Sequence, residues 1–102
     1  MATNRIAPVH PGEILKIEFL DPLGISQNQL ARTMRVPPER INSIVLKRRG
    51  ITVDTAMRLG IALNTTPEFW MNLQTLFDLQ TAKDQLTPTI KREVIPLVKD
   101  EK

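Results

Sequence analysis

Three side chains near the middle of the sequence have the chemistry needed to bind the edges of nucleic-acid bases. Arg40, Asn42 and Ser43 stand within four residues of one another. An arginine can pair with guanine, an asparagine can pair with adenine, and a serine hydroxyl can bond to either. Ile41 and Ile44 stand three residues apart, so a helix in this segment that buries both would turn the polar side chains away from the core. The segment is therefore a candidate base-reading helix.

The surrounding residues could hold the phosphate backbone. Segment 32–49 has six basic residues and one acid, a net charge of +5, whereas segment 54–84 has a net charge of −2. Gln27 opens a predicted helix, where its side chain and the first N–H groups could bind a phosphate. Lys47 and Arg48 follow the candidate base-reading helix and would neutralise backbone charge. A solvated basic surface would give the same charge pattern, so this alternative remains open.

The sequence offers no constellation for catalysis or metal binding. His10 is the only histidine and there is no cysteine. A single histidine has no partner with which to relay protons or hold zinc, and its position before Pro11 favours a contact at the start of a helix. We therefore predict that the chain is not an enzyme, has no catalytic or metal-binding residues and needs no cofactor.

Length and composition indicate one small domain. The chain has 102 residues, of which 41% are hydrophobic and 4% are aromatic, so aliphatic side chains must form most of the core. No stretch approaches the roughly 20 apolar residues of a membrane span. We expect a cytoplasmic protein that does not contact a membrane and that is nucleoid-associated when bound to DNA.

Caps and apolar spacing predict an all-α fold with five short helices. The first begins near Pro11 and is stopped by segment 21–24. The second and third run from Ser26 to Met34 and from Pro38 to about Lys47. The fourth and fifth start at residues that favour the N-cap position, Thr52 and Thr66, and the fifth ends at about residue 80.

The second and third predicted helices have the pattern of a helix-turn-helix. Ala31 permits the two helices to cross closely, and the apolar residues of each face the other. Two ordinary helices of a bundle would look the same, and this alternative stays open. The turn position that glycine usually occupies, because it takes a positive φ, is Arg35 here. A residue other than glycine costs about 1 kcal/mol in that conformation, so either the turn is slightly altered or Arg35 is kept there because it contacts phosphate.

The fifth predicted helix is apolar on more than one side. Its apolar residues are candidates for both the core and a homodimer contact, and they are Phe69, Trp70, Leu73 and Phe77. The adjacent aromatic pair could instead form a base-stacking platform, but packing in the core is the favoured interpretation. Outside the predicted domain of residues 10–80, we expect a flexible N-terminal arm over residues 1–9. Residues 81–102 are expected to form a tail in which Pro88 breaks any helix, with an edge strand at most.

Four segments of the chain resemble one family. They are HPGEILK (10–16), LGISQNQLA (23–31), RGITVDTAMRL (49–59) and TPEFWMNLQ (66–74). In this order they resemble the HigA-type antitoxins, also known as virulence-associated protein I, of the Xre-type helix-turn-helix group. The resemblance covers about residues 10–80 and implies a five-helix, lambda-repressor-like DNA-binding domain.

The resemblance also implies a function. Members of the family form homodimers, bind palindromic double-stranded operator DNA at their own promoter and neutralise a HigB-type toxin, an mRNA endonuclease. The positions it implies for DNA contact are Pro37, Arg40, Asn42 and Ser43. Ile17 departs from the polar residue usual among relatives and could mark a partner surface. Two alternatives stay open: a stand-alone Xre-type regulator without a toxin, and a protein-interaction module that does not bind DNA.

Overall fold

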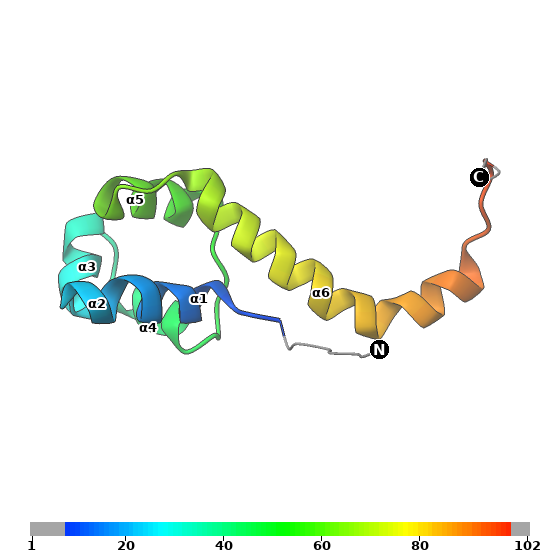
Figure 1. Cartoon of the computed structure of the whole chain (residues 1–102), viewed down its shortest axis with the longest axis horizontal. Coiled ribbons are helices and arrows are strands. Elements are labelled where there is room, and N and C mark those ends of the chain that lie inside the picture. Colours follow the sequence, from blue (N-terminus) through cyan, green and yellow to red (C-terminus); the bar gives the residue numbers. More distant parts are fainter. Residues whose placement is uncertain (1–7, 99–102) are drawn as a thin grey trace.

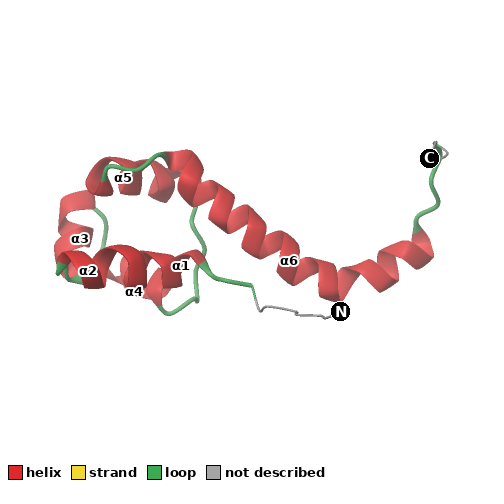
Figure 2. Ribbon diagram, viewed as in Figure 1, coloured by secondary structure: helices red, strands yellow, loops and turns green. Residues whose placement is uncertain are grey.

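A computed structural model describes residues 8–98 of the chain, and these residues form a helical domain with a long projecting helix (Figures 1 and 2). The first helix is one continuous rod made of α1 (Pro11–Ile14), a π-helical segment η1 (Leu15–Leu20) and α2 (Asp21–Leu23). It is followed by α3 (Gln27–Met34), α4 (Pro38–Val45), α5 (Val53–Leu63) and α6 (Pro67–Glu93). Counting the first rod as one helix, the five predicted helices and the all-α class are confirmed. None of the described helices is long and apolar enough to cross a membrane.

The helices start where the sequence predicts them. The hydroxyls of Ser26, Thr52 and Thr66 each accept a hydrogen bond from the backbone N–H three residues later. His10 caps the first helix in the same way, because its Nδ1 accepts the N–H of Gly12 at 2.9 Å. Each cap satisfies a donor that the first turn of a helix leaves without a partner. The expected contact of His10 at a helix start is therefore confirmed.

The core is made mainly of aliphatic side chains from all five helices. Trp70 is completely buried and is the largest residue in the core, and its indole Nε1 donates to the Thr65 hydroxyl at 2.8 Å. The other fully enclosed apolar residues come from the first helix, α3, α4 and α5, and they are Leu15, Ala31, Ile41, Ile44, Ala56 and Leu59. The expectation that Trp70 belongs to the core is confirmed, and a base-stacking role for its ring is excluded by its burial.

One glycine is required by a close approach between helices. The first helix crosses α4 so closely at Gly12 that a Cβ on this residue would overlap the backbone carbonyl oxygen of Ile44. Backbone cannot move aside as the end of a flexible side chain can. Gly12 therefore fixes the distance between the first helix and the C-terminal end of α4.

The prediction for the C-terminal segment is wrong. Residues 81–93 continue α6 as a helix of 27 residues, and no strand is present within residues 8–98. Pro88 lies inside this helix, where it removes one backbone donor and kinks the helix without ending it. Figure 1 shows the resulting change of direction between the yellow and orange parts of α6. The helix ends at Glu93, and the backbone of the following residue, Val94, is extended. Residues 1–7 of the predicted arm lie outside the described residues.

We expect Gly12→Ala to destabilise the protein by about 1–3 kcal/mol, because the added methyl group must push α4 away from the first helix. The measurement is the free energy of unfolding in urea. Gly24→Ala is the matched control, since Gly24 has a φ of +66° but open space around its Cα. This control should lose about 1 kcal/mol from conformation alone. A Gly12→Ala protein as stable as the wild type would contradict the close crossing.

Candidate nucleic-acid interface

Helices α3 and α4 form the predicted helix-turn-helix, and the turn between them keeps its usual left-handed conformation. Arg35 has φ 60° and ψ 43°. Its N–H donates to the Arg32 carbonyl oxygen at 3.2 Å, and the N–H of Val36 donates to the Ala31 carbonyl oxygen at 3.0 Å. These bonds satisfy carbonyl groups at the end of α3 that the helix itself leaves open. The turn is therefore not altered, and Arg35 takes the left-handed conformation that glycine usually occupies.

The outer face of α4 brings together two of the predicted DNA-binding residues. Asn42 is exposed, and its Nδ2 donates to Oε1 of Gln27 at 3.2 Å. Gln27 is the first residue of α3, so this bond joins the start of α3 to the middle of α4. Ser43 lies beside Asn42 and is half-buried, and Pro37 is exposed at the N-cap position of α4.

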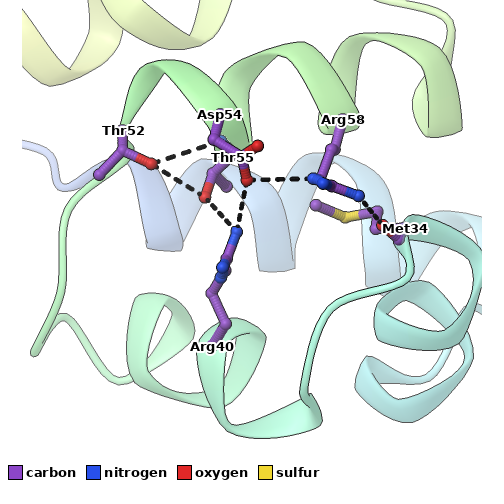
Figure 3. Close-up of polar contacts among 6 residues, drawn as sticks. All are labelled: Met34, Arg40, Thr52, Asp54, Thr55 and Arg58. Atoms are coloured by element: carbon purple, nitrogen blue, oxygen red, sulfur yellow. Dashed lines mark hydrogen bonds and ion pairs between the residues drawn. The ribbon is translucent and has the colours of Figure 1, made fainter.

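Arg40 does not project freely from α4. Its side chain is 28% exposed, and its Nη1 donates to Oδ2 of Asp54 at 2.7 Å and to the Thr55 hydroxyl at 3.5 Å (Figure 3). The guanidinium thus lies against α5, which differs from the predicted outward direction. The hydrogen bond from Arg40, followed by the one from Arg58, lowers the pKa of Asp54 from its ordinary value of 3.8.

Arg58 extends this contact to the end of α3. Its Nε donates to the same Asp54 oxygen at 3.0 Å, and its Nη1 donates to the carbonyl oxygen of Met34 at 2.8 Å (Figure 3). Met34 is the last residue of α3, so Asp54 and Arg58 connect α5 to both helices of the motif. Sequence reasoning missed these two residues. Their spacing of four within one predicted helix, which pairs opposite charges, was the available signal.

The basic residues after α4 lie in a tight turn. Lys47 has φ 65°, so the helix ends at Val45, two residues earlier than predicted. The Nζ atom of Lys47 lies 3.4 Å from Oε1 of Glu13 in an exposed ion pair. Arg48 is exposed, and its backbone N–H donates to the Ser43 carbonyl oxygen at 2.8 Å. These bonds place Lys47 and Arg48 at the C-terminal end of α4.

The aromatic residues of α6 divide between the core and the surface. Trp70 is buried, whereas Phe69 is 38% exposed and packs edge-on against it with ring centroids 5.0 Å apart. Leu73 is half-buried and packs against the core. Phe77 is half-buried and meets the imidazole of His10 at 4.8 Å between ring centroids.

His10 is a buried titratable group close to α4. It is 5% exposed, and its Nδ1 accepts a hydrogen bond, so the neutral form is the one that caps the first helix. Burial is the main cause that lowers its pKa from 6.5, and the positive charge of Lys47 adds to the effect. Asp78 and Glu13 act in the opposite direction. The net result favours the uncharged imidazole in the folded state.

A family model described as Helix-turn-helix matches residues 16–70. Virulence-associated protein I of Dichelobacter nodosus is 44% identical over 98 residues, which cover 95% of this chain and 88% of the relative. Antitoxin HigA-1 of Vibrio cholerae is 36% identical over 85 residues, which cover 83% of this chain and 80% of the relative. These matches extend beyond the motif to most of the domain.

Two solved structures with nucleic acid are also similar to this chain. Pseudomonas aeruginosa antitoxin HigA with the higBA promoter has a TM-score of 0.85 and 45% identity, over 89% of this chain and 99% of that chain. Antitoxin GraA in complex with its operator has a TM-score of 0.87 and 46% identity, over 97% of this chain and 100% of that chain.

The fold and the motif define a helix-turn-helix protein of the regulatory class. The chain belongs to the helix-turn-helix family and, within it, to the group of virulence-associated protein I and the HigA antitoxins. The resemblance seen in the sequence is thus confirmed. Because this is a family of DNA-binding regulators, the prediction that the chain is not an enzyme is confirmed as well.

We expect the stability of the protein to rise with pH between about pH 5 and 7. The folded pKa of His10 lies below the unfolded value, so the unfolded state binds more protons in this window. The stability contributed by neutral His10 is present above pH 6.5 and is lost as the pH falls through the lowered pKa. The measurement is the urea unfolding free energy as a function of pH.

His10→Asn is the control for this pH dependence, since asparagine also accepts an N-cap hydrogen bond but does not titrate. Its stability should change less over the same range. Titration of Asp54 does not contribute to the change in stability over this pH range, because its pKa lies below 3.8. Equal stability of the wild type at both ends of the range would contradict the assignment.

Proposed function

We propose that this chain is a transcriptional repressor that binds the operator of its own operon as a homodimer and acts as the antitoxin of a type II toxin–antitoxin pair. The observation that carries the proposal is the helix-turn-helix itself, with the hydrogen-bonded pair Gln27–Asn42 on its outer face. Similar antitoxins have been solved with a promoter and with an operator, which supports the same class of ligand here.

Asn42 is the proposed base-reading residue. Its amide donates one hydrogen of Nδ2 to Gln27, which fixes the orientation of the amide plane. The carbonyl oxygen and the second hydrogen of Nδ2 are then the groups that adenine requires along its major-groove edge. Ser43 would contact a neighbouring base or phosphate from the same face. Gln27 thereby acts twice, by orienting Asn42 and by approaching the phosphate at the start of α3.

The phosphate contacts are proposed for the C-terminal end of α4, which Lys47 and Arg48 follow. Pro37, at the start of α4, has neither charge nor N–H, so its proposed contact with DNA is one of packing. Cations in this position neutralise backbone charge without reading sequence, so they contribute affinity that falls as salt rises. Arg40 is proposed to affect DNA binding through its contact with Asp54.

The projecting part of α6 is the proposed homodimer contact. Four exposed apolar residues follow one side of it at intervals of three, seven and four residues, and they are Leu76, Leu79, Leu86 and Ile90. This spacing is close to the 3.5-residue repeat of helices that pair along an apolar seam. A second copy of the chain has the same seam, and two-fold pairing would present two α4 helices to the two half-sites of a palindromic operator.

The toxin proposed as the second partner is a HigB-type mRNA endonuclease. The identity of 36% with antitoxin HigA-1 of Vibrio cholerae supports this part of the proposal. A toxin reading frame beside the gene, whose growth arrest is relieved by co-expression of this chain, would separate an antitoxin from a stand-alone regulator. Growth arrest that persists at full expression of this chain would contradict the antitoxin role.

Asn42→Ala should weaken binding to the protein's own upstream DNA by about 1–3 kcal/mol and relax specificity at one base position. The measurement is fluorescence anisotropy with a labelled operator and a panel of single-base variants. An equal loss of affinity on every sequence would contradict a base-reading role for Asn42.

Arg48→Ala is the matched comparison for Asn42→Ala, because it removes a phosphate contact rather than a base contact. It should weaken binding to all sequences alike and reduce the salt slope of the logarithm of affinity by about one unit. The measurement is the same titration repeated at several salt concentrations. An unchanged slope would place Arg48 outside the interface.

Leu86→Glu should weaken the homodimer at least tenfold, since burying an unpaired charge in the seam costs more than about 1.4 kcal/mol. The measurement is sedimentation equilibrium. Gln85→Glu is the control, because it adds the same charge one residue away on a different side of α6. Equal dimerisation of the two variants would contradict the seam.

A further inference from the structure

Asp54 lies at the centre of a polar network between α5 and the proposed base-reading helix, α4. One of its carboxylate oxygens, Oδ2, accepts hydrogen bonds from Arg40 of α4 at 2.7 Å and from Arg58 of α5 at 3.0 Å (Figure 3). The Asp54 side chain is 54% exposed, so the network is formed at the surface and is open to solvent. A pair of this kind contributes little to stability. The ion pair matters more for the direction in which the Arg40 side chain points than for the stability of the fold.

The network keeps one arginine of α4 away from the reading surface. Arg40 precedes Asn42 by two residues, and its side chain is turned to α5 by Asp54 and by the Thr55 hydroxyl. A free arginine in that position would bind guanine edges and any phosphate within reach, and phosphate contacts are independent of sequence. With Arg40 held, the outer face of α4 presents the short side chains of Asn42 and Ser43.

The surface around the pair has an excess of positive charge. A groove of about 450 Å³ adjoins the pair, and its lining residues include three arginines and a single acid; they are Arg40, Arg49, Thr52, Asp54, Thr55 and Arg58. Asp54 removes one unit from the positive charge of this groove and repels a phosphate that approaches it. The carboxylate therefore acts in two ways, by holding Arg40 and by lowering the local positive potential.

We infer that Asp54 is a positioning residue that sets the DNA specificity of this protein, because it restrains Arg40 and limits binding to DNA of unrelated sequence. The inference rests on the proposed function, in which α4 reads the operator. Asp54 itself contacts no base in this account. Its carboxylate acts through Arg40, so removing it increases affinity for unrelated DNA more than affinity for the operator.

The test compares the wild type with Asp54→Asn, Asp54→Glu and the double variant Arg40→Ala/Asp54→Asn, with Arg40→Ala as its reference. Each is titrated against its own upstream DNA and against a scrambled duplex of equal length, at several salt concentrations. We expect Asp54→Asn to bind the scrambled duplex about tenfold tighter, to reduce the ratio of the two affinities and to steepen the salt slope by about one unit. Asp54→Glu keeps the charge and should stay closer to the wild-type ratio.

The Arg40→Ala background separates the two roles of Asp54. There, Asp54→Asn should change the affinity ratio by less than half as much as in the wild type, because no guanidinium is released. Thermal unfolding of each variant reports any purely structural effect.

Two results would overturn the inference. In one, Asp54→Asn lowers the melting temperature and weakens binding to both duplexes equally; in the other, it leaves the affinity ratio and the salt slope unchanged. A wild type that does not prefer its own upstream DNA would instead overturn the proposed function and with it this inference.

Discussion

Burial of Ile41 and Ile44 determines which face of α4 remains in solvent. Both side chains are completely buried, as is Ala31 of α3, and burying each isoleucine contributes about 1.5–3 kcal/mol. Because a helix has one orientation in which both side chains can be buried, Asn42 must lie on the outside. The functional surface is thus a consequence of core packing, and the residues that form it contribute little to the fold themselves.

Three further contacts keep α4 in this orientation. Gly12 lets the first helix touch the backbone of Ile44, the left-handed turn at Arg35 sets the angle between α3 and α4, and Arg58 binds the end of α3 from α5. Each of these contacts involves backbone, so the position of α4 does not depend on its exposed side chains. A rigid scaffold of this kind reduces the conformational entropy that binding must overcome.

The sequence predicts what local chemistry determines and misses what distant contacts determine. The caps at Ser26, Thr52 and Thr66 depend on a few neighbouring residues, and all three are confirmed. The direction of Arg40 depends on Asp54, fourteen residues away, which helical spacing within α4 cannot reveal. The C-terminal prediction failed for a different reason, since a proline inside a helix can bend it without ending it. DNA contacts at the individual positions stay predictions.

In the proposed function, two copies of the chain, held rigidly through α6, present their α4 helices to two half-sites of one operator. The most direct measurement is a footprint on the native upstream DNA and on a version lengthened between the half-sites by about 5 base pairs, half a turn of the duplex. A rigid dimer cannot reach a half-site that has been turned to the far side, so tight binding and full protection should disappear. Undiminished protection of both half-sites after the insertion would show that each copy binds independently and would contradict the account.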